Sequence, residues 1–281
     1  MIYEHEIPLK SRLYFAKSAS VKREIEFHAS KILQECGYQE IVTPYFSYHQ
    51  HQEIDEKKLI RINDKDNHIL TLRADSTLDV VRLITKRLGR TTDQKRWFYI
   101  QPVFRSPTSE QYQIGAEYLG NCTLLKSIDA SIKILEKLEL KPHLQISNMM
   151  IPKLLSKELD ISINYFKDAN LQEIFSLGIS WLSDLASLQK KEDISRLIDE
   201  VPSYLKDELK KIELLTKEIK YDDIIVAPLY YAKMRYYDGL FYRFFTNNKR
   251  VGQGGLYNYE GECCSGFALY TDNIIEELIN R

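Results

Sequence analysis

The chain has 281 residues, which is ample length to bury a core without stabilising disulfides or metals. Its 39 lysines and arginines against 40 aspartates and glutamates leave a net charge of -1, whereas a dedicated nucleic-acid binder usually carries a basic surplus. No apolar run approaches the roughly 18 residues of a membrane span, and the start, MIYEHEIPLK, is not a secretory signal. We therefore predict a globular cytoplasmic protein and do not expect a nucleic acid or a membrane as its partner.

The first predicted helix is followed directly by a strand. Apolar residues from Val21 to Leu33 recur at helical spacing, with Ser20 as the expected cap and Gly37 as the left-handed stop. The segment EIVTPYF that follows is rich in strand formers, and Pro44 within it indicates an edge or terminating strand.

A hairpin and a second helix come next. Residues 59–63 and 68–74 alternate apolar and polar side chains on either side of the turn DKDN, which predicts a hairpin. Ser76 or Thr77 is then expected to cap a helix that ends near Leu88.

The rest of the chain contains strands on both sides of a long helical region. From Ile151 to about Tyr221 the pattern is almost all helical, and we interpret this region as a helical insertion. An Asn247–Asn248 turn is expected within the strand segment 237–255. The other predicted strands are 96–104, 114–120, 143–148, 223–231 and 266–270, and the other helices are 124–140 and 272–279. Hairpins dominate and helices flank them, so we predict an α+β fold with a mainly antiparallel sheet.

The cysteines and glycines give weaker signals. Cys36, Cys122, Cys263 and Cys264 form no CxxC pair, which favours free thiols in a reducing cytosol over a disulfide or a zinc site. Six of the 11 glycines lie between 239 and 266. The GQGG run at 252–255 is compatible with a hairpin bulge or with a ligand cradle.

Four charged residues lie at the ends of apolar strands or inside them. These are Arg73, Asp75, Arg105 and Glu117. A buried charge is costly unless it is paired, so such residues mark either structural ion pairs or the wall of a site. A sheet face bearing arginine, acids and tyrosines suits a small zwitterion, because the acids bind its amino group and arginine its carboxylate.

Two further polar groups have a simpler interpretation. The six histidines are scattered, and the HQH at 49–51 lacks a nearby third ligand, so we predict a surface loop and no metal site. The cationic stretch from Lys86 to Arg96 is compatible with a solvated helix end or with a phosphate-binding patch.

Taken in order, several segments resemble the catalytic domain of class II aminoacyl-tRNA synthetases, and among them histidyl-tRNA synthetase. GYQEIVTPYF resembles the first motif, which builds the dimer interface, and FYIQPVFR with QIGAEYLG resembles the second. The remaining segments match in order: TLRADSTLDVVRLI, RYYDGLFYRFF, GQGGLYN and SGFAL, the last resembling the start of the third motif. The resemblance covers nearly the whole chain and implies one synthetase-like domain, 1–281, with the helical insertion at about 151–221 and without the anticodon-binding domain.

The departures from the synthetase pattern concern the cations that bind ATP. Arg105 matches the second-motif arginine, but the next seven residues, SPTSEQY, supply no cation. Asn273 stands where the third motif has an arginine, and Ala232 aligns with the histidine-specific arginine; Lys233 and Arg235 are nearby but not at that position. Preorganised cations stabilise phosphate charge by several kcal/mol, so their loss argues against aminoacylation and for a chain without catalytic residues.

The amino-acid pocket of the synthetase is better retained. Asp75 stands where the family has a glutamate for the α-amino group. The resemblance implies a histidine site made of Asp75, Thr77, Arg105, Gln113, Glu117, Tyr236 and Tyr237. A carboxylate and a phenol together can bind both imidazole nitrogens.

This profile resembles the regulatory subunits of short-form ATP phosphoribosyltransferase, the first enzyme of histidine biosynthesis. The resemblance implies a non-catalytic homodimer without cofactors, which binds the separate catalytic subunit and lets histidine regulate it. Two alternatives remain, a histidine-activating ligase that uses ATP and Mg²⁺, and a stand-alone histidine-binding adaptor.

Overall fold

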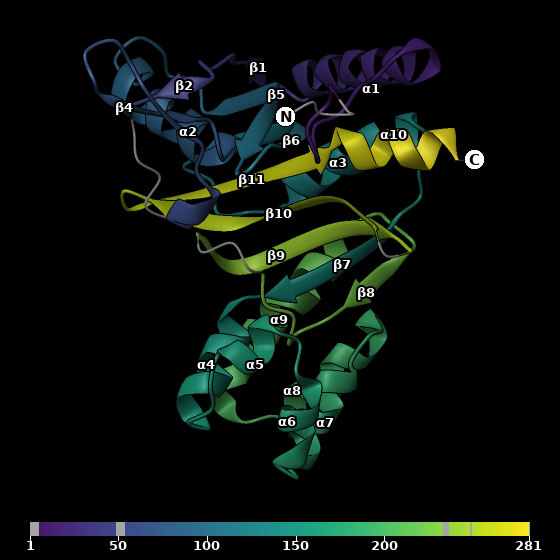
Figure 1. Ribbon diagram of the computed structural model, residues 1–281. Helices are drawn as coiled ribbons and strands as arrows, with labels where there is room; N and C mark the ends of the chain where they lie inside the picture. The colour runs from purple at the N-terminus through teal and green to yellow at the C-terminus, as the bar shows by residue number, and fades with distance from the viewer. Residues whose placement is uncertain (1–5, 49–53, 233–235, 248, 281) are drawn as a thin grey trace. The chain divides into compact units, whose positions relative to one another are not determined.

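The computed structural model describes residues 6–48, 54–232, 236–247 and 249–280 (Figure 1). The chain divides into two compact units, and each is described by itself. Unit 1 comprises Met1–Leu119, Lys133–Leu140 and Ala268–Arg281, and unit 2 comprises Gly120–Ile132 and Lys141–Phe267. Two elements begin in unit 2 and end in unit 1, namely α3 (Leu125–Lys137) and β11 (Glu262–Tyr270).

Helix α1 (Ala16–Glu35) starts four residues before the predicted cap. Ser20 does not cap it. Instead, the Phe15 N–H donates to the Ser18 hydroxyl at 3.0 Å, and the same hydroxyl donates to the Phe15 carbonyl at 2.8 Å. The predicted stop is confirmed, because Gly37 has a φ of +81°. In unit 1, α1 contacts α10 (Thr271–Ile279), and the two helices lie side by side in Figure 1.

Helix α2 (Ser76–Leu83) is capped by Asp75, so the predicted cap at Ser76 or Thr77 was wrong. Asp75 has extended backbone angles, which a capping residue needs, and its carboxylate accepts the Leu78 N–H at 3.1 Å. A π-helical turn, η2 (Ile84–Leu88), continues α2 to the predicted end.

The strands of unit 1 form the edge of the main sheet and a small separate sheet. β1 (Gln39–Glu40) pairs in parallel with β5 (Arg96–Arg105), which forms an antiparallel hairpin with β6 (Ser109–Leu119). The small sheet has the order β2-β4-β3, where β2 is Phe46–Ser47, β3 is Arg61–Asn63 and β4 is Ile69–Leu72, and the 3₁₀ turn η1 (Glu56–Lys58) precedes β3. The segment EIVTPYF therefore forms two short strands, because the strand is interrupted on both sides of Pro44, which lacks an N–H donor.

Unit 2 contains strands in the order β10-β9-β7-β8. These are β7 (His143–Asn148), β8 (Ile224–Val226), β9 (Tyr237–Thr246) and β10 (Lys249–Tyr259). β9 pairs antiparallel with β7 and β10, but β7 and β8 are parallel. The prediction of a mainly antiparallel sheet was therefore wrong, and the main sheet is mixed. Two parallel strands need a long crossover, and here the crossover is the helical region that the sequence indicated.

The segment between β7 and β8 is helical. Its elements are α4 (Met150–Glu158), α5 (Asn164–Lys167), α6 (Leu171–Ser176), α7 (Ser180–Ser187), η3 (Lys191–Asp193), α8 (Ile194–Glu200) and α9 (Ser203–Glu218) (Figure 1, teal to green). α9 contacts β7, and its buried residues Leu205, Leu209 and Ile212 have the spacing of one helical face. Among the described residues, no helix is both long and apolar enough to cross a membrane.

The glycine-rich hairpin and two of the cysteines lie in unit 2. β9 and β10 pair up to Lys249 opposite Thr246, and Asn247 has a φ of +48°; Asn248 lies outside the described residues. The GQGG run pairs residue for residue with 241–244, and the register shifts lie on either side of it, between Arg250 and Gly252 and between Gly255 and Tyr257.

Cys122 and Cys263 form a disulfide, so the prediction of four free thiols was wrong for these two. Their sequence separation of 141 gives no signal of proximity, because only the fold brings the two cysteines together. Cys36 and Cys264 are free thiols, as predicted.

Candidate amino-acid site

The candidate site in unit 1 is built on the β5–β6 hairpin. Its register places Tyr99 opposite Gly115, and Gln101 opposite Gln113. Side chains alternate between the two faces of a strand, so Gln113, Gly115 and Glu117 lie on one face of β6. Two of the predicted histidine-binding residues therefore share a face with a glycine between them.

Gly115 leaves the space that the Tyr99 ring occupies. A Cβ atom at this position would lie 2.3 Å from both Cζ and the hydroxyl oxygen of Tyr99, closer than real Cβ contacts allow. The ring therefore crosses β6 where there is no side chain, and its hydroxyl reaches the next residue on that face, Glu117.

A chain of three hydroxyl and carboxyl groups results, which we call the Tyr99 chain (Thr77, Tyr99 and Glu117). The Tyr99 hydroxyl donates to Glu117 Oε1 at 3.3 Å and lies 3.2 Å from Thr77 Oγ1. Tyr99 and Glu117 are 0% exposed and Thr77 is 7% exposed. The structure thus brings together two predicted site residues, Thr77 and Glu117, through a tyrosine that the sequence interpretation missed. The sequence predicted the two strands that contain Tyr99 and Gly115 but not their pairing, so it gave no signal for this contact.

Two other predicted site residues of unit 1, Asp75 and Gln113, make structural contacts of their own. Asp75 lies two residues before Thr77 and is buried, and one carboxylate oxygen caps α2. Gln113 is also buried, and its side-chain amide donates to Gln111 Oε1 at 3.1 Å. Both residues lie in unit 1 with the Tyr99 chain.

Arg105 lies at the end of β5, beside a cavity of about 560 Å³ in unit 1. Its Nε donates to the Ala74 carbonyl at 3.2 Å. Asn273, which replaces the expected third-motif arginine, lines the same cavity. The N-terminal segment contributes two cations that the sequence did not place there, Lys10 and Arg12.

The same cavity is lined by a buried acid, Asp272, at the start of α10. Its carboxylate accepts from the Tyr14 hydroxyl and, at 2.9 Å, from the Tyr112 N–H. Burial raises the pKa of Asp272, while these two hydrogen bonds oppose the rise. Burial and Asp272 both raise the pKa of Tyr14. Arg12 forms an ion pair with Glu276 at 2.6 Å, which raises the pKa of the arginine.

Arg73 has a structural role. Its side chain is fully buried, and burial lowers its pKa. Its guanidinium donates to the Pro102 carbonyl, the Thr43 carbonyl and Gln101 Oε1, each at 2.9 Å. These partners are neutral oxygens, so hydrogen bonds from Arg73 fix the chain around Thr43 against β5, while the charge of Asp79 opposes the fall in its pKa.

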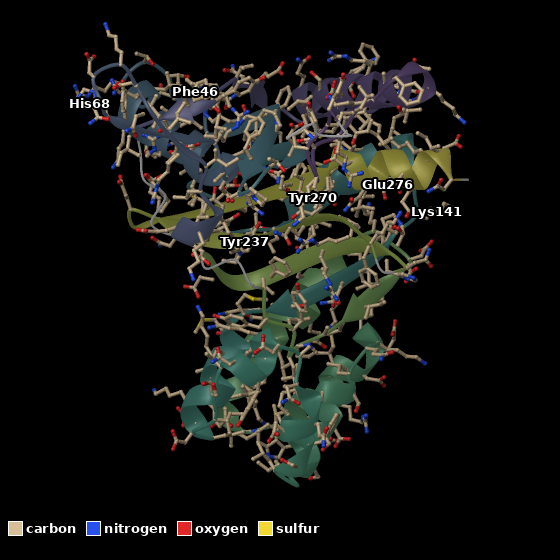
Figure 2. All side chains as sticks on the ribbon, in the orientation of Figure 1. Phe46, His68, Lys141, Tyr237, Tyr270 and Glu276 are labelled. Carbon is tan, nitrogen blue, oxygen red and sulfur yellow. A yellow bond between two sulfur atoms is a disulfide. The ribbon has the colours of Figure 1, made fainter. Side chains whose placement is uncertain are left out.

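The predicted double tyrosine lies in unit 2. The rings of Tyr236 and Tyr237 are 4.6 Å apart, and Tyr237 also makes an edge-to-face contact with Phe241. Tyr237, labelled in Figure 2, is buried. Ala232 is buried as well; the nearby cations considered as substitutes, Lys233 and Arg235, lie outside the described residues.

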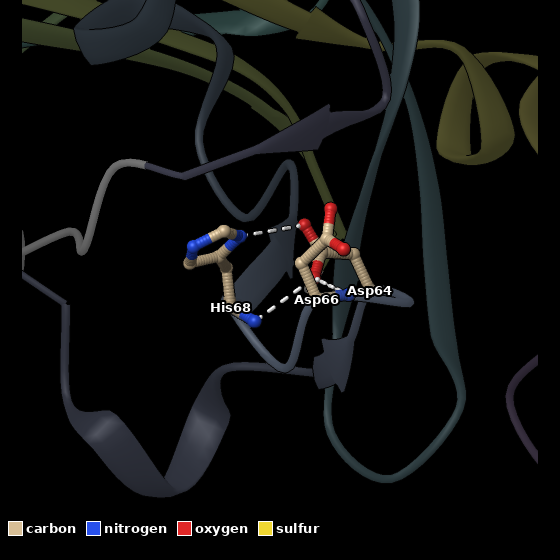
Figure 3. Close-up of side chains that lie close together, drawn as sticks. All are labelled: Asp64, Asp66 and His68. Atoms are coloured by element: carbon tan, nitrogen blue, oxygen red, sulfur yellow. Dashed lines mark hydrogen bonds and ion pairs between the residues drawn. The ribbon is translucent and has the colours of Figure 1, made fainter.

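Possible metal ligands cluster in the turn between β3 and β4. The ligand atoms of Asp64, Asp66 and His68 lie within 4.8 Å of one another (Figure 3). Asp64 accepts the N–H groups of Asp66 and His68, each at 2.9 Å, and the His68 N–H lowers its pKa. These contacts are those of an aspartate that stabilises a turn. The HQH at 49–51, for which a surface loop was predicted, lies outside the described residues.

Comparison with known proteins identifies the class and then the family. The family model for histidyl-tRNA synthetase matches residues 14–274, which defines a histidyl-tRNA synthetase-like chain. The ATP phosphoribosyltransferase regulatory subunit of Wolinella succinogenes is 45% identical over 282 residues, covering 100% of this chain and 98% of that protein. The chain belongs to the ATP phosphoribosyltransferase regulatory subunit family, as the motif resemblance indicated.

Solved structures show the same fold. An ATP phosphoribosyltransferase regulatory subunit/histidyl-tRNA synthetase from Bacillus halodurans aligns with a TM-score of 0.87 at 20% identity, over 99% of this chain and 84% of that chain. A chain of the ATP phosphoribosyl transferase (HisG:HisZ) complex from Thermotoga maritima aligns with a TM-score of 0.70 at 17% identity, over 89% and 97%. The class II synthetase-like fold is thereby confirmed.

Proposed function

We propose that this chain is the non-catalytic regulatory subunit of an ATP phosphoribosyltransferase, which catalyses the first step of histidine biosynthesis. The main support for this proposal is the 45% identity, over essentially the whole length, to the Wolinella succinogenes protein of that name. The Thermotoga maritima structure of a two-component complex supports a separate catalytic subunit as the partner. The proposed location is the cytoplasm, where histidine is made.

The proposed regulator is histidine, bound at the site around the Tyr99 chain. A fully buried carboxylate such as Glu117 is costly unless it serves a partner, and it can accept an imidazole N–H. Asp75, Arg105 and Gln113 of unit 1 are the other proposed contacts of this site, and the roles of Tyr236 and Tyr237 stay predictions. Feedback then requires that histidine binds the active and inactive states of the assembly with different affinity.

The cavity beside Arg105 supports the non-catalytic role. A polyphosphate there would meet the carboxylates of Asp272 and Glu110, and Arg12 is already paired with Glu276. Asn273 adds no charge where the synthetase has an arginine. Lys10 and Arg105 remain as cations of this cavity, but the two acids offset them, which reduces the preorganised positive charge that phosphoryl chemistry needs.

An exposed apolar surface around Pro44 supports a homodimer. Val42, Tyr45, Phe46 and Tyr48 are each more than half exposed (Phe46 in Figure 2). Large exposed patches of this kind mark interaction sites. The segment resembles the dimer-building motif of the synthetases, so a second copy is the proposed occupant.

Two assays test this function. Co-purification with a short-form catalytic subunit, followed by a rate assay with ATP and phosphoribosyl pyrophosphate, should show a complex, a higher rate and inhibition by histidine. A chain that forms no complex and changes neither rate nor histidine sensitivity would refute the proposal. Histidine-dependent ATP–pyrophosphate exchange should be absent, and robust exchange would instead establish the ligase alternative.

A further inference from the structure

The disulfide between Cys122 and Cys263 joins two parts of unit 2 at an accessible position. Cys122 lies in the segment 120–124, just before α3, and it is exposed even with its sulfur in the bond. Cys263, the second residue of β11, is half-buried. A small thiol in solution can therefore approach the bond from the side of Cys122.

Other contacts hold the same two parts of unit 2 together. Leu124, just before α3, and Ile128, within it, are 1% and 0% exposed. Near the start of the helix, the Ser127 hydroxyl donates to Ser265 Oγ on β11 at 3.4 Å. The start of α3 is therefore held by apolar burial and by a hydrogen bond to β11, and neither of these involves a sulfur atom.

The backbone fits both the bonded and the reduced state of the two cysteines. Their Cα atoms are 5.4 Å apart, within the range that a disulfide spans without backbone movement. The Asn121 side-chain amide donates to the Thr123 carbonyl at 3.3 Å, and the Leu125 N–H donates to Thr123 Oγ1 at 3.4 Å. Both bonds stay within the segment that carries Cys122, so they persist when the disulfide opens.

We propose that Cys122 and Cys263 form a reversible redox site, which low-molecular-weight thiols open and the corresponding disulfides close. The inference uses the proposed cytoplasmic location but not the histidine site. A disulfide in a reducing cytosol is usually transient, and a chain of 281 residues has the core to fold without a permanent cross-link. The free thiols that the sequence predicts and the bond that the structure contains are then two states of one pair.

The exchange proceeds in two steps. A thiolate of the small thiol attacks the Cys122 sulfur, the S–S bond breaks, and Cys263 leaves as a thiolate that takes a proton from water. A second small thiolate attacks the small-molecule sulfur of the mixed disulfide and releases Cys122, which is protonated in the same way. The protein gains two electrons and two protons, and the two small thiols that lose them become one disulfide. Buried Cys264 follows Cys263 on the opposite face of β11 and takes no part.

The first test equilibrates the full chain, under native conditions, with mixtures of reduced and oxidised glutathione. After an acid quench, unfolding and alkylation with a maleimide, intact mass spectrometry counts the free thiols. We expect two, Cys36 and Cys264, in excess oxidised glutathione and all four in excess reduced glutathione, with the same end points from both directions. A bond that survives excess reduced glutathione until the chain unfolds would make the disulfide structural and overturn the proposal, and four free thiols in every mixture would also overturn it.

Matched cysteine variants assign the pair. Cys122→Ser and Cys263→Ser should each abolish the two-electron transition. Cys36→Ser and Cys264→Ser, which remove the other two thiols, should each keep it. Loss of the transition in Cys264→Ser would place the bond on the neighbouring sulfur and contradict the assignment.

The second test is thermal unfolding of the two states. Closing a loop with a sequence separation of 141 should raise the Tm by about 10 °C, because the cross-link restricts the unfolded chain. The wild type should lose this increase on reduction, and Cys122→Ser should show the Tm of the reduced wild type in both buffers. Circular dichroism at 25 °C should be the same in both states. An unfolded reduced chain at that temperature would show that the fold requires the bond, and the site would not be reversible.

Discussion

In each unit, a tyrosine crosses its hairpin partner strand over the glycine that lies opposite it in register. In unit 1, Tyr99 lies over Gly115; in unit 2, Tyr242 lies over Gly254, and both pairs are opposite each other in register. Both tyrosines are fully buried. A Cβ atom on Gly254 would approach the Tyr242 ring to 2.6 Å, as one on Gly115 would approach Tyr99.

The two pairs differ in where their hydrogen bonds end. The Tyr242 hydroxyl lies 3.1 Å from Ser131 Oγ, which donates to the Ser127 carbonyl at 2.9 Å, so this chain is neutral and ends on the backbone. The Tyr99 chain ends on the carboxyl group of Glu117. A neutral chain closed on the backbone stabilises a fold, whereas a buried carboxyl group is costly unless it is paired or serves a ligand. The same packing arrangement is thus structural in unit 2, and in unit 1 it lies at the proposed site.

The largest expected effect is on stability in unit 2. Gly254→Ala should lower the free energy of unfolding by about 3 kcal/mol, because the new methyl group would lie 2.5 Å from the Gly266 carbonyl, which the strand holds in place. Urea denaturation measures this change. A loss below that of Gly115→Ala would contradict the comparison, since the methyl group at 115 meets only a side chain.

Removal of the charge should have the next largest effect. Glu117→Gln should weaken histidine binding about 30-fold, because a hydrogen bond to a charged group contributes about 2 kcal/mol. Calorimetry gives the affinity, and circular dichroism should confirm an unchanged fold. Wild-type affinity in this variant would remove Glu117 from the site.

Displacement of the Tyr99 ring should weaken histidine binding less than the loss of the Glu117 charge. Gly115→Ala should weaken histidine about tenfold, because the methyl group pushes the Tyr99 hydroxyl away from Thr77 and Glu117. The same calorimetric titration measures it. Full affinity would show that the position of the ring does not matter, and the two tyrosines would then be equivalent.

Loss of the Tyr242 hydroxyl in unit 2 should affect stability alone. Tyr242→Phe should lower the free energy of unfolding by about 1 kcal/mol, the usual contribution of one buried hydrogen bond. Histidine affinity should not change. A decrease in affinity, measured beside the urea transition, would mean that the chain in unit 2 also serves the ligand.

The smallest effect concerns a second tyrosine–carboxyl pair in unit 1, Tyr14 and Asp272. Burial raises the folded-state pKa of Asp272 above 3.8, so the folded state binds the proton more tightly than the unfolded state does. The favourable contribution of the protonated form is present below 3.8 and is lost as the pH rises through the folded-state pKa.

Asp272→Asn removes this titration. The unfolding free energy of the wild type minus that of Asp272→Asn should therefore decrease as the pH rises from 3.8, in denaturant titrations at several pH values. A free-energy difference that increases with pH would contradict the predicted rise in the pKa of Asp272. Histidine affinity should stay unchanged, which separates this pair from Tyr99 and Glu117.

The local signals in the sequence were sufficient for most of the elements. Alternation located the β3–β4 hairpin, and helical spacing located α1 and the region between β7 and β8. Helix starts were less accurate, because Ser18 and Asp75 stabilise them from positions that hydrophobic spacing does not indicate. The parallel pairing of β7 and β8 also escaped prediction, since it depends on how the intervening helices return the chain.

The site was predicted only in part. Motif resemblance named Thr77 and Glu117, and the structure connects them. It could not name Tyr99, whose role depends on a register opposite Gly115. It also missed Lys10 and Arg12 at the cavity, because contacts between residues about 90 positions apart leave no local pattern.

The sequence by itself determined the class of the protein, the order of its motifs and the residue types of the proposed pocket. These follow from local periodicity and from motifs that need no knowledge of distance. Only the tertiary structure decided which side chains share a proton, which cysteines meet and which strands run in parallel. Each of these depends on distances between parts of the chain far apart in sequence, and such distances are fixed by packing.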